Sequence, residues 1–185
     1  MIKKVIMLAI LLFPVLAMAQ NEEDKKQTKY EEFVSKTGII TKFVDTKMEK
    51  CFFNVNESFK VTLRMVYGEV KNHYFLILEE GTFMSGSHSS AHIEYSDLVE
   101  INKAFAKLLS EVDADRELRP EYLQNIFTSV DGFSVGYYVE KSKVKWIIKL
   151  RHGADKISFK QPMEIANYLL DAQKKIESIM AQNGK

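Results

Sequence analysis

The strongest constraint on this fold is a pattern of short alternating runs followed by a helical stripe, which occurs twice along the chain. In the first half, apolar and polar residues alternate, which is typical of strands with one buried face. The alternating segments are 39–44, 52–55, 59–67, 74–78 and 91–95. An apolar stripe at helical spacing follows and predicts one helix. Its members are Ile101, Phe105, Leu108 and Val112.

The same order of elements returns in the second half. Four more alternating segments predict strands at 126–130, 133–139, 144–150 and 157–159. A second stripe predicts a second helix, and its members are Ile165, Leu169, Ala172, Ile176 and Ile179. Asp97 is the expected N-cap of the first helix, because Glu100 completes a capping box. Pro162 is expected at the first position of the second helix, where its missing N–H costs nothing.

The two halves can be aligned. Residues 59–81 overlay 131–153 without a gap, in the same apolar phase, and the helices follow with an eight-residue difference in spacing. We interpret this as a tandem ββββα duplication with repeats 33–117 and 121–183. Chance agreement between two amphipathic hairpins is the alternative. Either way, the sequence predicts an α+β domain in which antiparallel β-sheets pack on two helices.

Four strands and a helix, twice over, form an order that resembles the topology of the PUR and Whirly single-strand nucleic-acid binders. The resemblance is in topology alone and would imply nucleic-acid binding. Nucleic-acid binders are usually strongly basic, whereas this chain has a net charge of +1. We therefore expect no nucleic-acid partner.

The N-terminal segment has the layout of a bacterial secretory signal peptide. Lys3 and Lys4 precede an apolar run over 5–18, and Ala17 and Ala19 supply the small residues that a signal peptidase accepts. We expect a signal peptide over 1–19, cleaved before Gln20, and a periplasmic or extracellular protein. The mature chain would then have a flexible polar lead-in over 20–32, a single domain over 33–185 and no membrane span.

Cys51 is the single cysteine, so disulfide bonds within the chain cannot stabilise this domain. It lies beside Phe52 and Phe53 in an apolar stretch. We expect its thiol to be buried as a small apolar group.

Two motifs offer candidate enzyme chemistry. Residues 132–136 match the G-x-S-x-G pattern around a nucleophilic serine, Ser134, but a strand-like run follows where that motif requires a helix. His88 and His92 have the spacing of zinc ligands on a helix, but they lie in a Gly/Ser-rich stretch that reads as a loop. We therefore predict no catalytic residue, no metal site and no cofactor. A hydrolase or metal enzyme that uses these residues is the alternative.

The remaining feature is a basic stretch over 141–160, which contains one acidic residue, Asp155. Strand alternation sends Trp146, Ile148 and Leu150 to the core. The opposite phase displays basic side chains on one outer face, and we interpret them as a binding surface for an anionic partner. They are Lys145, Lys149, Arg151, Lys156 and Lys160.

These features predict an exported, non-enzymatic binding or structural protein of the cell envelope or extracellular space. The expected partner is an anionic glycan, a lipid headgroup or another exported protein. An inhibitor or adaptor of an exported protein is a further alternative, and a plain solvated sheet face would explain the lysines without any partner.

Overall fold

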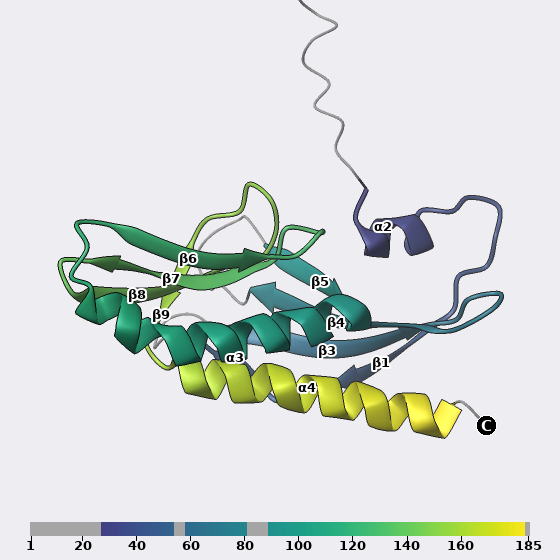
Figure 1. Ribbon diagram of the computed structural model, residues 1–185. Coiled ribbons are helices and arrows are strands. Elements are labelled where there is room, and N and C mark those ends of the chain that lie inside the picture. The colour runs from purple at the N-terminus through teal and green to yellow at the C-terminus, as the bar shows by residue number, and fades with distance from the viewer. Residues whose placement is uncertain (1–26, 54–57, 81–88, 184–185) are drawn as a thin grey trace, which may run out of the picture.

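The computed structural model describes residues 27–53, 58–80 and 89–183 (Figure 1). The predicted signal peptide and lead-in residues 20–26 lie outside these ranges. In chain order the elements are α2 (Lys29–Val34), β1 (Phe43–Lys47), β2 (Cys51–Phe52), β3 (Ser58–Val66), β4 (His73–Glu80), β5 (Ser90–Glu94), α3 (Tyr95–Glu117), β6 (Leu123–Thr128), β7 (Ser134–Glu140), β8 (Lys143–Lys149), β9 (Ile157–Phe159) and α4 (Pro162–Asn183). None of these helices is long and apolar enough to cross a bilayer.

The strands form two antiparallel sheets. Sheet A has the order β1-β3-β4-β5, with β2 also paired to β3, and sheet B has the order β6-β7-β8-β9. Strands that follow one another mostly pair with one another, as alternating segments joined by short turns should. The α+β fold with antiparallel sheets and two long helices is confirmed.

The central hairpins of the two sheets have the same register. Leu63 pairs with Leu76 in sheet A, and Val135 pairs with Ile148 in sheet B. Each of these partners differs by the same sequence offset, 72, that aligns the two halves. Equivalent residues therefore occupy equivalent positions in the two ladders. A common origin of the halves stays a prediction.

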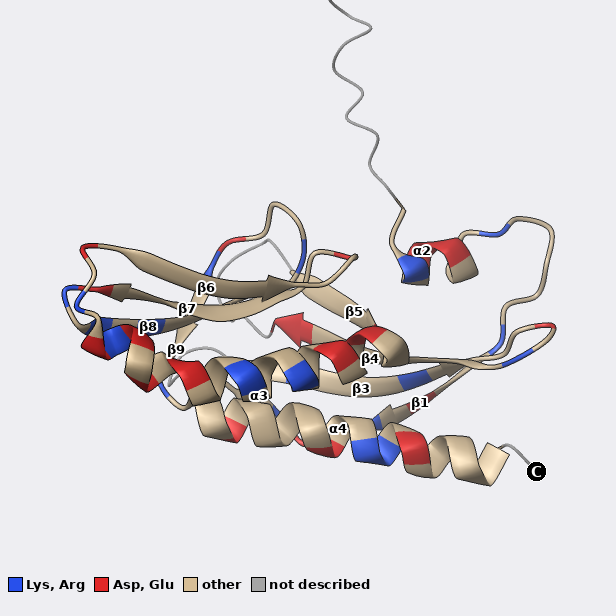
Figure 2. Ribbon diagram, viewed as in Figure 1, with Lys and Arg blue, Asp and Glu red and all other residues tan. Residues whose placement is uncertain are grey.

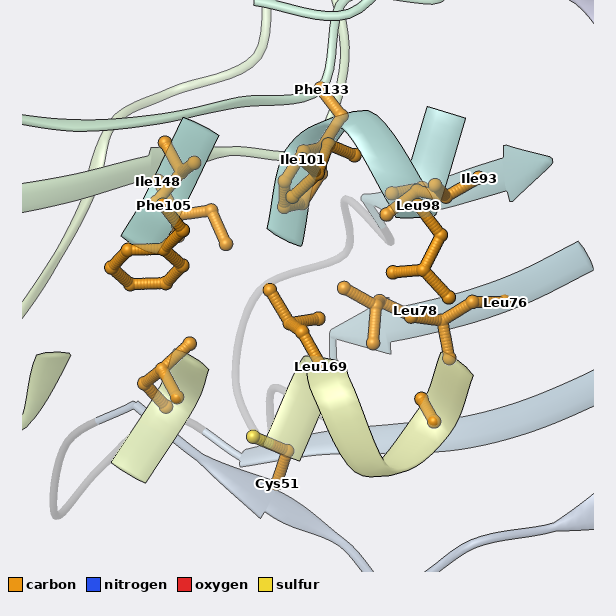
Figure 3. Close-up of a cluster of buried hydrophobic side chains, with 14 of the residues drawn as sticks. Cys51, Leu76, Leu78, Ile93, Leu98, Ile101, Phe105, Phe133, Ile148 and Leu169 are labelled. Atoms are coloured by element: carbon orange, nitrogen blue, oxygen red, sulfur yellow. The ribbon is translucent and has the colours of Figure 1, made fainter. Parts of the chain in front are cut away.

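The inner faces of both sheets share one hydrophobic core with the two long helices. α3 and α4 lie side by side beneath the sheets in Figure 1. Figure 3 shows Leu98, Ile101 and Phe105 of α3 together with Leu169 of α4 in this core. The helical stripes are thus confirmed, with Val112 and Ile179 only partly buried at their ends.

The helix starts differ from expectation in one case. α4 begins at Pro162 as predicted. α3 begins at Tyr95, so its N-cap is Glu94 and the prediction of Asp97 as the cap is wrong. The reason is that β5 runs directly into α3 without a linker. The carboxylate of Asp97, in the first turn, instead binds Lys29 of α2.

Trp146 is buried in the core, with 6% of its surface exposed. Burial in the core was predicted from the alternation of the strand. The ring lies 5.7 Å from Phe105 of α3, 4.8 Å from Tyr137 and 6.1 Å from Phe159. The helix of the first half therefore covers part of the sheet of the second half, which joins the two halves into one unit.

The short helix α2 packs on the outer face of sheet A. Thr28 and Glu31 close a capping box at its start. Tyr30 and Phe33 lie one turn apart and contact Phe75, which is fully buried. Residues 29–32, which we expected in the flexible lead-in, are thus part of a packed helix.

Candidate functional site

The basic residues of β8 lie on the outer face of sheet B. Trp146 and Ile148 point into the core, so the alternation of the strand places Lys145 and Lys149 on the opposite face. Lys145 is exposed and Lys149 is half-buried. The predicted strand phase is therefore confirmed.

The register between β8 and β9, extended by one residue at each end, brings these lysines near two others. Trp146 pairs with Phe159 and Ile148 with Ile157. One residue beyond each end of this ladder, the same register sets Lys145 opposite Lys160 and Lys149 opposite Lys156. β9 is the last strand of sheet B and β8 is its neighbour, so the four lysines lie on and beside the two outermost strands at this side of the sheet. We call them the basic edge: Lys145, Lys149, Lys156 and Lys160.

Within residues 27–53, 58–80 and 89–183, no carboxylate forms an ion pair with the basic edge. The lysines of α3 differ in this respect, since Lys103 lies 2.9 Å from Glu100 and Lys107 lies 3.7 Å from Glu111. Figure 2 shows acidic and basic residues side by side along α3. The positive charge of the basic edge is thus not neutralised by described side chains.

The spacing of the basic edge limits what can bind there. Paired strands are about 4.8 Å apart, and four residues along a strand span about 13 Å. The two lysine pairs therefore form two rows about 13 Å from one another. Like charges directly opposite each other across a ladder are destabilising. A bound anion would relieve that repulsion within each row.

Aromatic side chains border one row of the basic edge. The ammonium group of Lys145 lies 5.7 Å from the ring centre of Tyr138, its partner across the ladder. Tyr138 stacks on Tyr122 at 6.2 Å, and Tyr122 is 59% exposed. The two tyrosines extend this row with a surface that can contact an apolar part of a ligand. Sequence reasoning missed them, although Tyr138 belongs to the outward phase of β7 and Tyr122 directly precedes β6.

Arg151 lies apart from the four lysines. It follows β8 in a turn and lines a cavity of about 240 Å³ between α2 and the edges of the two sheets, together with Tyr30, Glu31, His92 and Asp131. The structure thus brings four of the five predicted basic residues together, and places the fifth beside a histidine that we considered as a metal ligand.

His92 packs against α2. Its ring stacks on Tyr30 at 4.1 Å and an angle of 9°. Burial, and then the charge of Arg64, lower the pKa of His92. His88, its predicted partner in the metal alternative, lies outside the described residues. In the parts of the chain that the structure describes, no three potential ligands come close enough together to hold a metal ion.

Ser134 is the first residue of β7 and is 6% exposed. Its hydroxyl donates to the carbonyl of Gly132 at 3.2 Å and accepts from Thr128 at 3.0 Å. The residues after Gly136 continue the strand, so the strand-to-helix turn of a nucleophile elbow is not formed here. These contacts place Ser134 within the sheet.

Cys51 is buried beneath α4, with 5% of its surface exposed (Figure 3). Burial raises the pKa of its thiol to about 12. A thiol with so high a pKa is protonated at neutral pH and therefore a poor nucleophile. The prediction of a buried cysteine is confirmed.

A polar junction at the start of α2 was also missed. The ammonium group of Lys29 lies 2.7 Å from Asp97 and 3.2 Å from Glu94, while its backbone N–H donates to Asp131. Burial alone would lower the pKa of Lys29, but these two carboxylates raise it. The junction ties α2 to both halves of the chain. The capping-box pattern from Thr28 to Glu31 was the sequence signal for this helix.

Comparison with protein-family models, with curated proteins and with solved structures finds no match to this chain.

Proposed function

We propose that this chain is an exported, non-enzymatic binding protein whose basic edge holds an extended polyanion. The observation that carries the proposal is the register of β8 and β9, which pairs Trp146 with Phe159 and Ile148 with Ile157. Continued by one residue at each end, it brings Lys145 near Lys160 and Lys149 near Lys156, and none of the four forms an ion pair with a described carboxylate. Such a surface attracts anions locally even though the chain as a whole is almost neutral.

The geometry favours an extended ligand over a small one. A single phosphate or sulfate can contact both lysines of one row, which are one strand spacing apart. It cannot also reach the second row, about 13 Å away. A chain with repeated negative charges, such as an acidic glycan, can contact both rows at once. The exposed ring of Tyr122 would face the uncharged parts of such a chain.

Retention on immobilised dextran sulfate, with neutral dextran as the reference matrix, tests this proposal. The protein should bind dextran sulfate at low salt and elute as salt rises, because exposed charges are screened beyond about 10 Å at 0.1 M. The double substitution Lys145→Glu and Lys149→Glu should abolish retention. The matched substitution of Lys103 and Lys107 to Glu changes the net charge equally on α3 and should retain binding.

Other results of these measurements would point to a different ligand or to none. Equal retention of both double variants would mean that the basic edge is a solvated surface. Binding to anionic vesicles that is lost with Lys145→Glu and Lys149→Glu, in a protein that ignores dextran sulfate, would identify a lipid headgroup as the ligand. Capture of an acidic envelope protein by the same surface would support the adaptor alternative.

Export is the second part of the proposal and rests on the pattern of residues 1–19. Intact mass of the protein recovered from the periplasm or the medium measures it directly. We expect a chain that begins at Gln20. Recovery of the full chain in the membrane fraction would contradict export.

A further inference from the structure

The end of the molecule opposite sheet B exposes a group of apolar side chains. The loop between α2 and β1 and the β3–β4 hairpin both project at this end, on the right in Figure 1. Half of the large apolar side chains that are exposed in the described residues lie here, and Ile40 and Val70 are each 97% exposed. We call this group the apolar tip: Ile39, Ile40, Phe43, Val44, Tyr67 and Val70.

The two chain segments of the apolar tip contact one another, although Phe43 and Val44, consecutive in β1, face opposite sides of sheet A. The backbone N–H of Tyr67 donates to the carbonyl of Lys42 at 2.9 Å, and the ammonium group of Lys42 lies 4.3 Å from the Tyr67 ring. The positive charges of Lys71 in the hairpin and Lys36 in the loop both lower the pKa of His73, which lies between the two segments. The two projecting segments therefore lie side by side.

Basic residues surround the apolar tip. Lys36, Lys42 and Lys71 are exposed, and in the described ranges none forms an ion pair with a carboxylate. Asp45, the acidic residue of β1, is already bound by the guanidinium of Arg64 through two contacts of 2.7 Å. The charge around the tip is thus positive on balance, with Glu69 as the opposing group of the hairpin.

We propose that the apolar tip docks this protein on an anionic lipid surface. Ile40 and Val70 would enter the boundary between headgroups and acyl chains, while Lys36, Lys42 and Lys71 would lie at the level of the lipid phosphates. Apolar side chains that project from loop tips between lysines suit the soft, negatively charged surface of a bilayer. A protein partner would more often meet a flat or hollow apolar patch with a polar rim.

This inference goes beyond the proposed function, because it concerns a different surface. The basic edge lies in sheet B, while the apolar tip belongs to sheet A and the loop before β1. A protein docked through the tip would leave the basic edge free. It would therefore hold a polyanion near the membrane surface.

Co-sedimentation with vesicles tests the proposal on the secreted protein. We expect binding to phosphatidylglycerol vesicles and much weaker binding to phosphatidylcholine vesicles. The double substitution Ile40→Ser and Val70→Ser should weaken binding at least about tenfold, because it removes both inserting side chains. It should not disturb folding, since both side chains are almost fully exposed. The matched control is Met163→Ser with Leu170→Ser, exposed apolar residues of α4, which should bind as the wild type does.

A fluorescent label gives a second readout. Ile40→Cys can carry an environment-sensitive dye, because Cys51 is buried and reacts poorly. Emission should shift to the blue on phosphatidylglycerol vesicles, and the same dye on Met163→Cys should not respond.

Three results would overturn the proposal. The first is equal vesicle binding by the Ile40/Val70 variant and the wild type, and the second is no vesicle binding by the wild type. The third is an oligomer, seen in sedimentation without lipid, that only the Ile40/Val70 substitution dissociates. The last would show that a second copy of this chain covers the tip. Loss of dextran sulfate binding alone leaves this proposal intact, because that ligand tests the basic edge.

Discussion

Sheet A and sheet B are alike on their inner faces and different on their outer faces. Inside, both contribute apolar rows of the same register to one core. Outside, sheet A carries Phe75 and Ile77 beneath the aromatic residues of α2. Sheet B carries the basic edge on the corresponding face, with the buried Ile147 between Lys145 and Lys149 and no described helix over it. The same folding pattern thus supports one outer face that is covered and one that is charged.

This difference separates the residues that build the core from those on which the proposed function rests. The apolar residues of the inner faces follow the alternation of buried and exposed positions that any two-layer domain needs. The outer rows are free to vary, and a shared architecture does not fix a function. The lysines of sheet B and the helix over sheet A are therefore the places where the outer faces of the two sheets differ most.

The largest loss of stability is expected from a substitution at the contact between the two halves. Trp146→Ala should lower the free energy of unfolding by about 3–5 kcal/mol, as for other large core aromatics, because it leaves a cavity among Phe105, Tyr137 and Phe159. Denaturant melts measure this loss. A loss below about 1 kcal/mol would mean that α3 does not seal the two sheets into one core.

The next largest loss of stability should differ between the outer faces of the two sheets. Tyr30→Ala removes the stacking on His92, the edge contact with Phe75 and the hydrogen bond from Arg64, and should cost about 2 kcal/mol. The matched change beside sheet B, Tyr122→Ala just before β6, removes an exposed ring and should cost less than about 0.5 kcal/mol. Equal losses in denaturant melts would contradict the view that only sheet A depends on its cover.

Periodicity made most of the fold predictable. The phase of β8 and the stripes of α3 and α4 are set by which residues must reach the core, and the sequence carries that information locally. The start of α3 was misjudged because Asp97 is a typical capping residue, whereas its actual partner, Lys29, lies far away in the chain. No local pattern records such a contact.

The candidate site was predictable only in part. Strand phase places Lys145 and Lys149 on the outer face, but their pairing with Lys160 and Lys156 depends on the β8–β9 register. That register follows from how the intervening turn is built, which apolar periodicity does not describe. The same turn sends Arg151 toward His92, away from the basic edge. Helix α2 was overlooked because a short polar segment resembles a flexible one.

A smaller change in stability is expected from pH, and it also concerns the packing of α2 on sheet A. Burial lowers the pKa of His92, so the unfolded chain binds more protons than the folded chain at mildly acidic pH. Stability should therefore fall as the pH drops through and below about 6.5, the usual pKa of histidine. His92→Phe keeps a ring against Tyr30 and removes this titration, so its stability should fall less.

The charges around His92 do not change this expectation. They are Arg64, Glu79 and Glu31, and the pKa of Glu31 is itself lowered, first by its hydrogen bond with the backbone of Thr28. A carboxylate with a lowered pKa stabilises the folded chain until it is protonated. That happens only at a more acidic pH, in the range where carboxylates titrate. Thermal melts between about pH 7 and 5 isolate the histidines. Identical pH profiles for His92→Phe and the wild type would show that His92 is not buried against α2.

The central claim is that the basic edge consists of like charges placed opposite one another for a ligand. The most direct test is one variant, Lys156→Glu with Lys160→Glu, measured both for stability and for retention on dextran sulfate. Both changes turn a repulsive cross-strand pair into an attractive one. The free energy of unfolding should rise by about 0.2–1 kcal/mol for each pair, while retention is lost. A less stable variant, or one that is retained as well as the wild type, would contradict the account.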